Sequence, residues 1–368
     1  MVIGIDGNEA NVEKKVGIGQ YAYELLLQFA KIKDEGRFKF EIYLKENPRA
    51  EMPVPTSNFK YRIVGPKKMW TQFGLPLSLF IEKRPDIFFT PTHYAPRFSP
   101  IPTAISIMDL SFIHFPNLFA KKDLYQLTNW TKYSVKNASR IFTISKASKS
   151  DIIDVYGVDG NKVHITYPGI KEESNARILT MDDLRKKFGI DKNYILFVGT
   201  LQPRKNIVKL IEAFSKIERE NLILVIVGKK GWLYEDILAA PEKFNVGDRV
   251  KFLDFVEDKD LPSLYKNALC FVLPSLYEGF GLPVLEAMKY GCPVITSNVS
   301  SLPEAGGDAA IYFDPNNADD IKEKIEKVIS NPKLRDELIE KGKLQIKKFS
   351  WEKTARETLR VLQELGGN

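Results

Sequence analysis

The chain has 368 residues, of which 44% are hydrophobic, so it is long enough for two domains of ordinary size, each with its own core. Its 54 basic and 47 acidic residues give a net charge of +7, and the excess lies in residues 1–170, which hold 23 Lys and Arg against 16 Asp and Glu. Two cysteines argue against a disulfide framework, and the lack of a run of about 18 apolar residues argues against a membrane-spanning helix.

A strand, a glycine loop and a helix open the chain. Val2 to Ile5 is apolar, a polar loop leads to Gly17 and Gly19, and Gln20 to Ile32 has apolar residues at helical spacing. The loop fits the dinucleotide fingerprint G-x-G-x-x-A poorly, because about ten polar residues separate it from its strand. We therefore expect a doubly wound unit without a nicotinamide or flavin site.

Apolar runs then alternate with helical or irregular segments, which predicts a parallel sheet covered by helices. The predicted strands are Phe38 to Leu44, Tyr61 to Val64, Ile87 to Thr90, Ala104 to Met108 and Ile141 to Ile144.

The segment Lys67 to Phe80 mixes basic residues with large apolar ones. This mixture fits a helix that docks on a membrane or an acceptor lipid, and it also fits a helix that packs on its own core. The basic first half could bind an anionic partner or form a solvated surface. No basic helix with aromatic platforms indicates nucleic-acid binding.

The pattern breaks near Tyr167, and a second alternation of strands and helices begins at Tyr194. The last helix, Trp351 to Leu365, has Ser350 as its expected N-cap and could pack back on the first domain. The predicted fold is α/β, with two doubly wound Rossmann-like domains facing each other across a crevice. The predicted segments are a first domain at 1–170, a linker at 171–192, a second domain at 193–350 and the returning helix at 351–368.

Two glutamates bracket a glycine-rich turn after the apolar strand Ala268 to Leu273. Glu278 lies on the turn, and Glu286 is expected in the first turn of a helix that begins at Pro283. An ionised carboxylate accepts hydrogen bonds from a vicinal diol, so this pair predicts a nucleotide-sugar site. Alternatively, Glu286 complements the helix dipole and Glu278 is a solvated loop residue.

Between these glutamates, the backbone amides of Phe280, Gly281 and Leu282 lie at the start of the predicted helix. Amides there are unpaired and carry the positive end of the helix dipole, so they form a cradle for phosphate.

Two cations, Arg204 and Lys205, follow the first strand of the second half, beyond Gly199 and Thr200. Ligands of open α/β sheets bind beyond the carboxyl ends of strands, where these cations could neutralise a departing diphosphate. The alternative is a solvated helix start.

Three histidines occur, at positions 93, 114 and 164. His93 follows the strand Ile87 to Thr90 and could contact a sugar or an acceptor, as could His114, whereas His164 lies in a predicted strand. No His-x-x-x-His or Cys-x-x-Cys spacing supports a protein-bound metal.

Five segments occur in the order typical of one enzyme family: G-I-G-Q-Y from Gly17, D-L-S-F-I-H-F-P from Asp109, G-T-L-Q-P-R-K-N from Gly199, E-G-F-G-L-P-V-L-E-A-M from Glu278, and S-L-P-E-A-G-G-D-A-A from Ser301. Together they resemble the retaining glycosyltransferases of family four, which have the GT-B fold. Glu278 and Glu286 have the eight-residue spacing of that family's E-x7-E motif.

The resemblance implies that Glu278 meets the donor sugar hydroxyls, Glu286 holds the ribose, and Arg204 and Lys205 grip the diphosphate. It implies a front-face substitution in which a donor phosphate oxygen helps take the acceptor's proton, with no cofactor, metal or enzyme nucleophile. The expected donor-binding set is completed by Gly17, Gly19, Gly199, Thr200, Asp254, Phe280, Gly281 and Leu282, and Asp109 and His93 join Glu278 and the two cations as catalytic candidates.

Two positions depart from the family pattern. Met108 stands where a histidine commonly precedes Asp109, and Asp254 follows Leu253 where glycine is common. The Asp254 carboxylate could accept a hydrogen bond from a guanine edge or cap a turn.

We expect a cytoplasmic hexosyltransferase, with possible peripheral contact to the inner face of the membrane, that moves mannose from GDP-mannose to a hydroxyl of a glycan or lipid-linked acceptor. The alternatives are a UDP-hexose donor, a nucleotide-sugar epimerase, or a non-catalytic nucleotide-sugar-binding protein.

Overall fold

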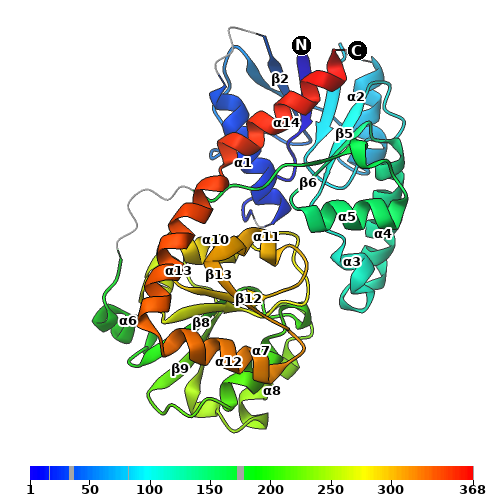
Figure 1. The fold of residues 1–368 in the computed structure, drawn as a ribbon. Coiled ribbons are helices and arrows are strands. Elements are labelled where there is room, and N and C mark those ends of the chain that lie inside the picture. Colours follow the sequence, from blue (N-terminus) through cyan, green and yellow to red (C-terminus); the bar gives the residue numbers. More distant parts are fainter. Residues whose placement is uncertain (16, 33–36, 82, 172–177, 368) are drawn as a thin grey trace. The chain divides into compact units, whose positions relative to one another are not determined.

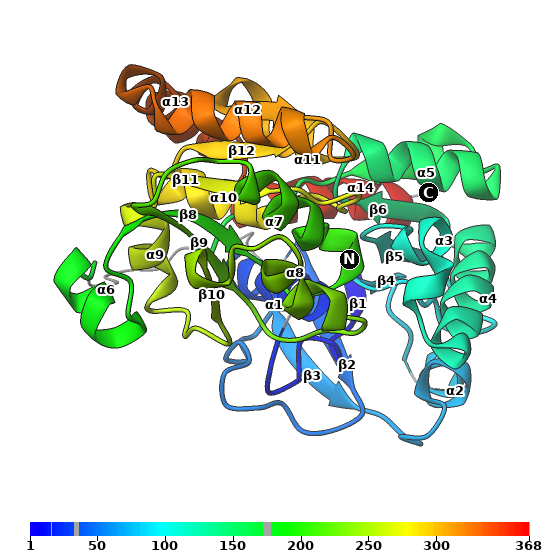
Figure 2. The ribbon, with the colours of Figure 1, turned by 90° about the horizontal axis from the view of Figure 1, so that it is seen from below.

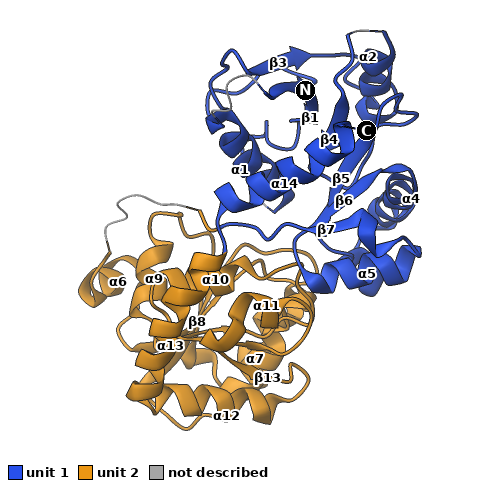
Figure 3. Ribbon diagram, turned by 45° about the horizontal axis from the view of Figure 1, so that its top comes forward, with its two compact units in different colours: residues 1–169, 349–368 blue, residues 170–348 orange. Residues whose placement is uncertain are grey.

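The computed structural model describes residues 1–15, 17–32, 37–81, 83–171 and 178–367, which form two compact units (Figure 3). Unit 1 comprises Met1–Gly169 and Phe349–Asn368, and unit 2 comprises Ile170–Lys348. Residue 16 of the predicted glycine loop, residues 172–177 of the predicted linker and residue 368 of the returning segment lie outside the described residues.

Unit 1 is built on a parallel sheet of seven strands in the order β3-β2-β1-β4-β5-β6-β7. Its central strands are buried on both faces, as the uninterrupted apolar runs predict. Ile3 of β1 pairs with Phe40 on one side and with Ile87 on the other. The strands are β1 (Val2–Asp6), β2 (Lys39–Leu44), β3 (Phe59–Ile63), β4 (Ile87–Thr90), β5 (Thr103–Ile107), β6 (Arg140–Thr143) and β7 (Val163–Ile165).

The helices of unit 1 follow the predicted alternation. They are α1 (Ile18–Lys31), α2 (Leu75–Ile81), α3 (Ser111–His114), α4 (Lys121–Asn137), α5 (Lys146–Tyr156) and α14 (Trp351–Gly366), with a π-helical turn at Trp70–Gly74 before α2 and short 3-10 turns at Pro116–Leu118 and Gly160–Lys162.

The last helix, α14, lies along α1 within unit 1 (Figure 1). Ser350 caps it by accepting a hydrogen bond from the amide of Lys353, as predicted. The Trp351 ring meets Tyr21 edge to face, with 5.8 Å between centroids, and Leu362 is fully buried in the same core. The amphipathic face of α14 therefore closes the core of the unit that the chain left at Gly169.

Unit 2 is built on a parallel sheet of six strands in the order β10-β9-β8-β11-β12-β13. Among its helices, α7 lies beside α8 and α12, and α10 lies beside α9, α11 and α13. Helices α12 and α13 lie side by side (Figure 2). The strands are β8 (Asn193–Val198), β9 (Leu222–Val227), β10 (Val250–Leu253), β11 (Cys270–Leu273), β12 (Val294–Ser297) and β13 (Ala310–Phe313). The helices are α6 (Met181–Phe188), α7 (Ile207–Ser215), α8 (Glu235–Lys243), α9 (Leu261–Asn267), α10 (Leu282–Lys289), α11 (Leu302–Gly306), α12 (Ala318–Ile329) and α13 (Pro332–Gln345), with 3-10 turns at Pro203–Lys205, Gly247–Arg249, Gly307–Ala309 and Ile346–Lys348.

The predicted linker at 171–192 is too wide, because α6 lies inside it. Thr180 and Asp183 form a reciprocal capping box there, and Leu184 is buried. A polar composition hid this helix, since only one of its faces meets the core.

The two cysteines, Cys270 and Cys292, are free and buried, as expected of small apolar side chains in a core. Burial raises the pKa of Cys270 to about 12. None of the helices in the described ranges is long and apolar enough to span a bilayer.

The doubly wound α/β prediction is confirmed for both sheets. In each sheet the strand order reverses once, between β1 and β4 in unit 1 and between β8 and β11 in unit 2. Loops at such a switch point diverge on opposite faces and leave room for a ligand beyond the strand ends.

Candidate functional site

The switch point of unit 2 brings together two loops that are far apart in sequence. Strands β8 and β11 are parallel neighbours, with Cys270 opposite Ile195, so both carboxyl ends lie at the same sheet edge. The loop after β8 carries Arg204 and Lys205 on a 3-10 turn, and the loop after β11 carries Glu278. The Leu276 amide donates to the Arg204 carbonyl at 2.9 Å and fixes one loop against the other.

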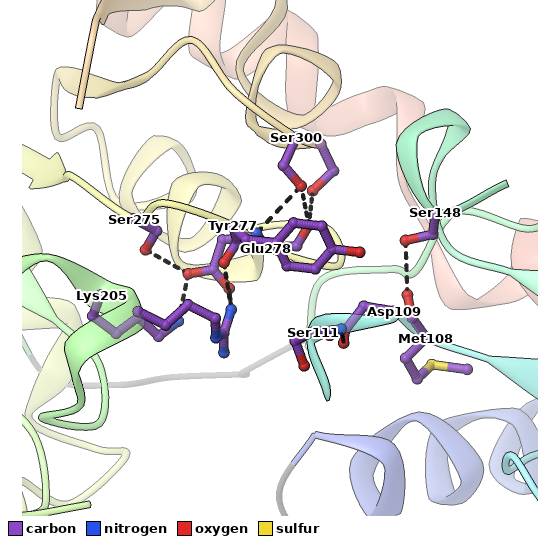
Figure 4. A network of polar contacts seen from close by, with 11 residues as sticks. Met108, Asp109, Ser111, Ser148, Lys205, Ser275, Tyr277, Glu278 and Ser300 are labelled. Carbon is purple, nitrogen blue, oxygen red and sulfur yellow. Dashed lines mark hydrogen bonds and ion pairs between the residues drawn. The ribbon is translucent and has the colours of Figure 1, made fainter. Parts of the chain in front are cut away.

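The Glu278 carboxylate is the centre of this arrangement (Figure 4). One oxygen accepts from Lys205 Nζ at 2.5 Å and from Ser275 Oγ at 2.6 Å, and the other accepts from Arg204 at 3.1 Å. Glu278 is only 7% exposed and Lys205 only 9%. Neither the solvated glutamate nor a solvated Lys205 describes the site, because a buried carboxylate and a buried ammonium are paired here.

Two opposing effects set the ionisation of Glu278. Burial alone raises the pKa of this carboxyl, but Lys205 and Arg204, assisted by the Ser275 hydroxyl, lower it to about 2. The nearby cations therefore outweigh desolvation, and Glu278 is ionised throughout the neutral range.

The backbone of Glu278 is clamped as firmly as its side chain. Ser300 Oγ donates to the Glu278 carbonyl at 2.6 Å and accepts from the Glu278 amide at 3.3 Å, and Ser301 Oγ donates to the same carbonyl at 2.8 Å. Ser300 has a φ of 56°, a left-handed conformation that is costly for a residue other than glycine. Arg204 also donates to the Tyr277 carbonyl. The loop is thus held in one conformation by contacts outside its own sequence.

The glycine turn ends in α10, which begins at Leu282. Gly281 has a φ of 100°, and a Cβ there would lie 2.7 Å from Leu302 Cδ2, so both conformation and space favour glycine. Phe280 is buried before the turn, and Gly281 is the N-cap. The amides of Gly281 and Leu282 therefore lie where α10 begins, beyond the carboxyl end of β11.

Glu286 lies in the second turn of α10, so its predicted place in the first turn is wrong. The positive φ of Gly281 starts the helix at Leu282 instead of Pro283, which leaves Glu286 one residue further from the positive end of the dipole. Its carboxylate accepts from Tyr265 Oη at 3.1 Å. Tyr265 is fully buried and stacks on Tyr290, with 5.9 Å between centroids, so it orients Glu286 from the core side.

Three other predicted donor residues lie at the same edge of the sheet. The Gly199 amide, just past β8, donates to the Val227 carbonyl at 2.9 Å, and the next residue, Thr200, is exposed. Asp254 is exposed after β10, beside Phe255, whose ring lies under Lys229 Nζ at 4.3 Å. Asp254 therefore lies on an outer strand, away from the Glu278 cluster along the sheet edge.

In unit 1, Gly17 ends the loop after β1, and Gly19 lies in the first turn of α1. Gly17 is the N-cap of α1 with a φ of 50°, and a Cβ on Gly19 would lie 2.8 Å from the Glu9 carbonyl oxygen. Asp6 ends β1, and its Oδ1 accepts from the backbone and side-chain nitrogens of Asn8 at 3.0 and 2.8 Å. Burial raises the pKa of Asp6 to about 6, although both Asn8 contacts oppose the shift.

His93 and Asp109 follow β4 and β5 in unit 1. His93 Nε2 accepts from the Met108 amide at 3.3 Å, which puts the imidazole proton on the buried Nδ1. Burial lowers the pKa of His93, although Asp109 acts in the opposite direction. Asp109 accepts from the Ser111 amide at 2.8 Å, as Figure 4 shows, so its carboxylate orders the start of α3.

Met108, where the family pattern has histidine, belongs to the same group. Ser148 Oγ of α5 donates to the Met108 carbonyl at 3.0 Å (Figure 4). The other candidate histidine of this unit, His114, lies 3.2 Å from Asp151 on α5. Unit 1 therefore places His93, Met108 and Asp109 together and His114 against another helix.

Sequence reasoning missed the residues that support the two glutamates. A hydroxyl three residues before Glu278 was visible in the sequence, as was a serine opening the segment from Ser301, but their partners lie on loops joined only by the fold. Tyr265 and the buried Asp6 carried no motif. The missed residues are Ser275, Ser300, Ser301, Tyr265 and Asp6.

Within the described ranges, no group of three or more His, Cys, Asp or Glu side chains is arranged to hold a metal ion. The concentrated positive charge at the unit 2 switch point comes from Arg204 and Lys205.

Comparisons with known proteins fit this geometry. Residues 17–174 match the family model described as Glycosyltransferase Family 4, and residues 180–345 match the model described as Glycosyl transferases group 1. The O-antigen chain mannosyltransferase B of Escherichia coli is 33% identical over 287 residues, which are 76% of this chain and 74% of that protein. The chain belongs to glycosyltransferase family 4.

Solved structures agree on the GT-B fold. Sucrose-phosphate synthase from Thermosynechococcus elongatus aligns over 99% of this chain and 98% of its own, with a TM-score of 0.73 and 17% identity. HepE of Anabaena in complex with UDP-glucose aligns over 99% of both chains, with a TM-score of 0.73 and 16% identity. The family 4 chain is thus a glycosyltransferase with two Rossmann-like domains, and the Glu278 cluster lies at the switch point of the second.

Proposed function

We propose that this glycosyltransferase moves mannose from GDP-mannose to a hydroxyl of a glycan or lipid-linked acceptor, with retention of anomeric configuration. The observation that carries the proposal is the Glu278 carboxylate, held ionised by Lys205 and Arg204 at the switch point of unit 2. A site with one anion and two cations has a net positive charge, which suits a ligand with a diphosphate and several hydroxyls.

Glu278 has capacity for one more hydrogen bond. An ionised carboxylate has about four acceptor positions, and among the described residues Lys205, Ser275 and Arg204 occupy three. We assign the remaining position, on the oxygen that faces Arg204, to a hydroxyl of the donor sugar. The serine clamp on the Glu278 backbone supports this role, because a positioning group must itself be fixed.

Arg204 and Lys205 supply positive charge where a leaving diphosphate develops negative charge. Electrostatic groups already in place need no reorganisation as the glycosidic bond breaks, and this effect is often the largest catalytic contribution. We infer a metal-independent, front-face substitution in which a donor phosphate oxygen helps remove the acceptor proton. The donor contacts include the amides of Phe280, Gly281 and Leu282, the loop at Gly199 and Thr200, and the amides around Gly17 and Gly19.

Glu286 is proposed to bind the ribose hydroxyls and Asp254 the nucleobase. Tyr265 Oη orients the Glu286 carboxylate, and the two oxygens of a carboxylate suit a vicinal diol. Mannose is favoured because O-antigen chain mannosyltransferase B is similar over most of the chain, and the exposed Asp254 carboxylate favours guanine. A UDP-hexose is the alternative donor, because HepE, with its UDP-glucose, has the same fold.

His93 and Asp109 of unit 1 are proposed to contact the acceptor or the donor sugar. We further propose that the protein works in the cytoplasm, with peripheral contact to the inner face of the membrane.

Nucleotide release from the purified protein tests the proposal, with GDP-mannose, UDP-glucose and UDP-galactose as donors and the product anomer assigned by NMR. We expect GDP release that depends on donor, persists in EDTA and disappears in the Glu278→Ala, Glu286→Ala double variant. Normal activity in that variant would overturn the site. Conversion of the donor without an acceptor would identify an epimerase, and donor binding without turnover with any acceptor would identify a binding protein.

A further inference from the structure

An apolar stripe is exposed on unit 1 around α2. Each side chain of the stripe is more than half exposed, and four of them recur at helical spacing along the π-turn and α2. The apolar stripe consists of Met69, Phe73, Leu77, Phe80, Ile81 and Phe98.

The helix that bears the stripe is apolar on both faces. Its inner face buries Trp70, Leu75 and Leu79 against the core that contains Tyr43 and Phe88. Polar side chains are almost missing from residues 70–81, where Thr71, Gln72 and the buried Ser78 are the ones present. The core explains the inner face alone, and a helix that is apolar all round needs a second apolar surface.

Phe98 joins the stripe from another loop. The Arg97 amide donates to the Thr71 carbonyl at 3.1 Å, and the Phe98 amide donates to Tyr133 Oη at 3.0 Å. Phe98 has a φ of 53° and is 74% exposed. A left-handed conformation is costly for phenylalanine, and hydrogen bonds hold the chain so that the Phe98 ring is exposed to solvent. Folding stability therefore does not explain the position of this side chain.

Basic residues flank the stripe. Lys67 and Lys68 precede it and Lys83 and Arg84 follow it, and all four are exposed. Residues 60–100 contain seven Lys and Arg against Glu82 and Asp86, so this segment holds most of the positive excess of the chain. Lys67 pairs with Glu46 at 3.1 Å, but both side chains are about two-thirds exposed, so the pair is weak. Lys67 can therefore exchange this pair for another anionic partner.

We propose that the apolar stripe and its basic flanks dock this protein on an anionic phospholipid bilayer. Apolar side chains enter the boundary between headgroups and acyl chains, while flanking lysines and arginines attract anionic headgroups. The α2 segment is far shorter than the roughly 20 residues that cross a bilayer, so it lies in the interface. The basic flanks favour an anionic bilayer over a purely apolar partner, because an uncharged surface gains no electrostatic attraction from them.

Co-sedimentation of the full chain with phosphatidylcholine vesicles, with and without phosphatidylglycerol, tests the proposal. We expect binding that requires phosphatidylglycerol and weakens with salt. The variant Phe73→Gln, Leu77→Gln, Phe80→Gln should lower the partition coefficient by at least about tenfold. The variant Lys67→Gln, Lys68→Gln, Lys83→Gln, Arg84→Gln should lower it by about tenfold and flatten the salt dependence.

A matched control removes three exposed apolar side chains elsewhere: Val54→Gln, Val155→Gln and Leu344→Gln. The control should bind vesicles like the unaltered protein. Equal loss in the control, or no binding to phosphatidylglycerol vesicles at low salt, overturns the proposal. The proposal is also overturned if the protein does not bind vesicles but forms a dimer that the variant Phe73→Gln, Leu77→Gln, Phe80→Gln dissociates. The apolar stripe would then bind a second copy of the chain. The assay contains no sugar donor, so its failure leaves the proposed transfer reaction untouched, and loss of transfer leaves the vesicle result untouched.

Discussion

The two sheets reverse their strand order in the same way, yet their switch points differ in charge. In unit 2, after β8 and β11, the Glu278 carboxylate accepts hydrogen bonds from two cations, and two serines hold the Glu278 backbone. In unit 1, the loops after β4 and β5 carry a half-buried imidazole, a methionine and Asp109, which accepts from the first amide of α3, and the buried carboxyl of Asp6 ends β1.

This difference shows how one architecture can divide a reaction. A fixed cluster of charges is suited to the part of a donor that never varies, its diphosphate and ribose. A weakly charged, half-buried surface suits an uncharged hydroxyl acceptor, whose recognition depends on shape. Substitutions in the Glu278 cluster of unit 2 should therefore affect donor chemistry, and those at His93 and Asp109 of unit 1 should affect acceptor use.

The largest expected effect comes from Glu278→Gln. The neutral amide loses its attraction for Lys205 and Arg204 and cannot accept as strongly from a sugar hydroxyl, so kcat should fall by about a thousandfold. Steady-state nucleotide release measures the change. Glu340→Gln, at an exposed position of α13, is the matched control, and a Glu278→Gln enzyme with kcat within a few fold of the control would break the assignment of Glu278.

Lys205→Met should lower kcat by about a hundredfold and also change the pH profile. With Lys205 present, the pKa of Glu278 is about 2, so its protonation does not limit activity at moderately acidic pH. Removing the ammonium leaves burial to raise this pKa, so activity should disappear at a higher pH than in the unaltered protein. Rates measured from pH 4 to pH 8 decide the point, and an acid limb that does not move would show that Lys205 does not control Glu278.

Glu286→Gln should raise the KM for the donor by about tenfold with a smaller effect on kcat, because it weakens a contact that persists from ground state to transition state. Tyr265→Phe removes only the hydroxyl that orients Glu286, and a rise of about threefold in the same KM is expected. Tyr290→Phe provides a control on the stacked partner ring. If Tyr265→Phe lowered thermal stability but left the donor KM unchanged, Tyr265 would be structural alone.

The smallest effect on donor binding should come from unit 1. Asp109→Asn and His93→Gln should leave the donor dissociation constant unchanged within about twofold, while the acceptor KM rises by about tenfold. Calorimetry with the donor and rates over a range of acceptor concentrations separate the two quantities. A large loss of donor affinity in either variant would erase the contrast between the two units.

Much of the fold was predictable because buried parallel strands are continuous apolar runs. Ile87–Thr90 is a strand with the expected bounds, and the last helix, expected from Trp351 to Leu365, spans Trp351–Gly366. The three-residue β7, which contains His164 and pairs with β6, confirms the strand expected at that histidine.

The individual residues of the candidate site could be predicted, but the contacts between them could not. Glu278, Arg204 and Lys205 were visible because each follows a strand at the ligand-binding edge. Their pairing was not, because it depends on β11 lying beside β8 across more than seventy residues of chain. The placement of Glu286 was wrong for a local reason, since the start of α10 is set by the backbone of Gly281.

The most direct measurement is calorimetric titration of GDP-mannose into the full chain without acceptor, compared with an Arg204→Met, Lys205→Met variant. We expect one site per chain in the unaltered protein and a loss of at least about a hundredfold in affinity in the variant, because both diphosphate contacts are gone while the fold persists. Equal affinity in the two proteins, with the variant folded by circular dichroism, would contradict the claim that the cluster around Glu278 binds the activated sugar.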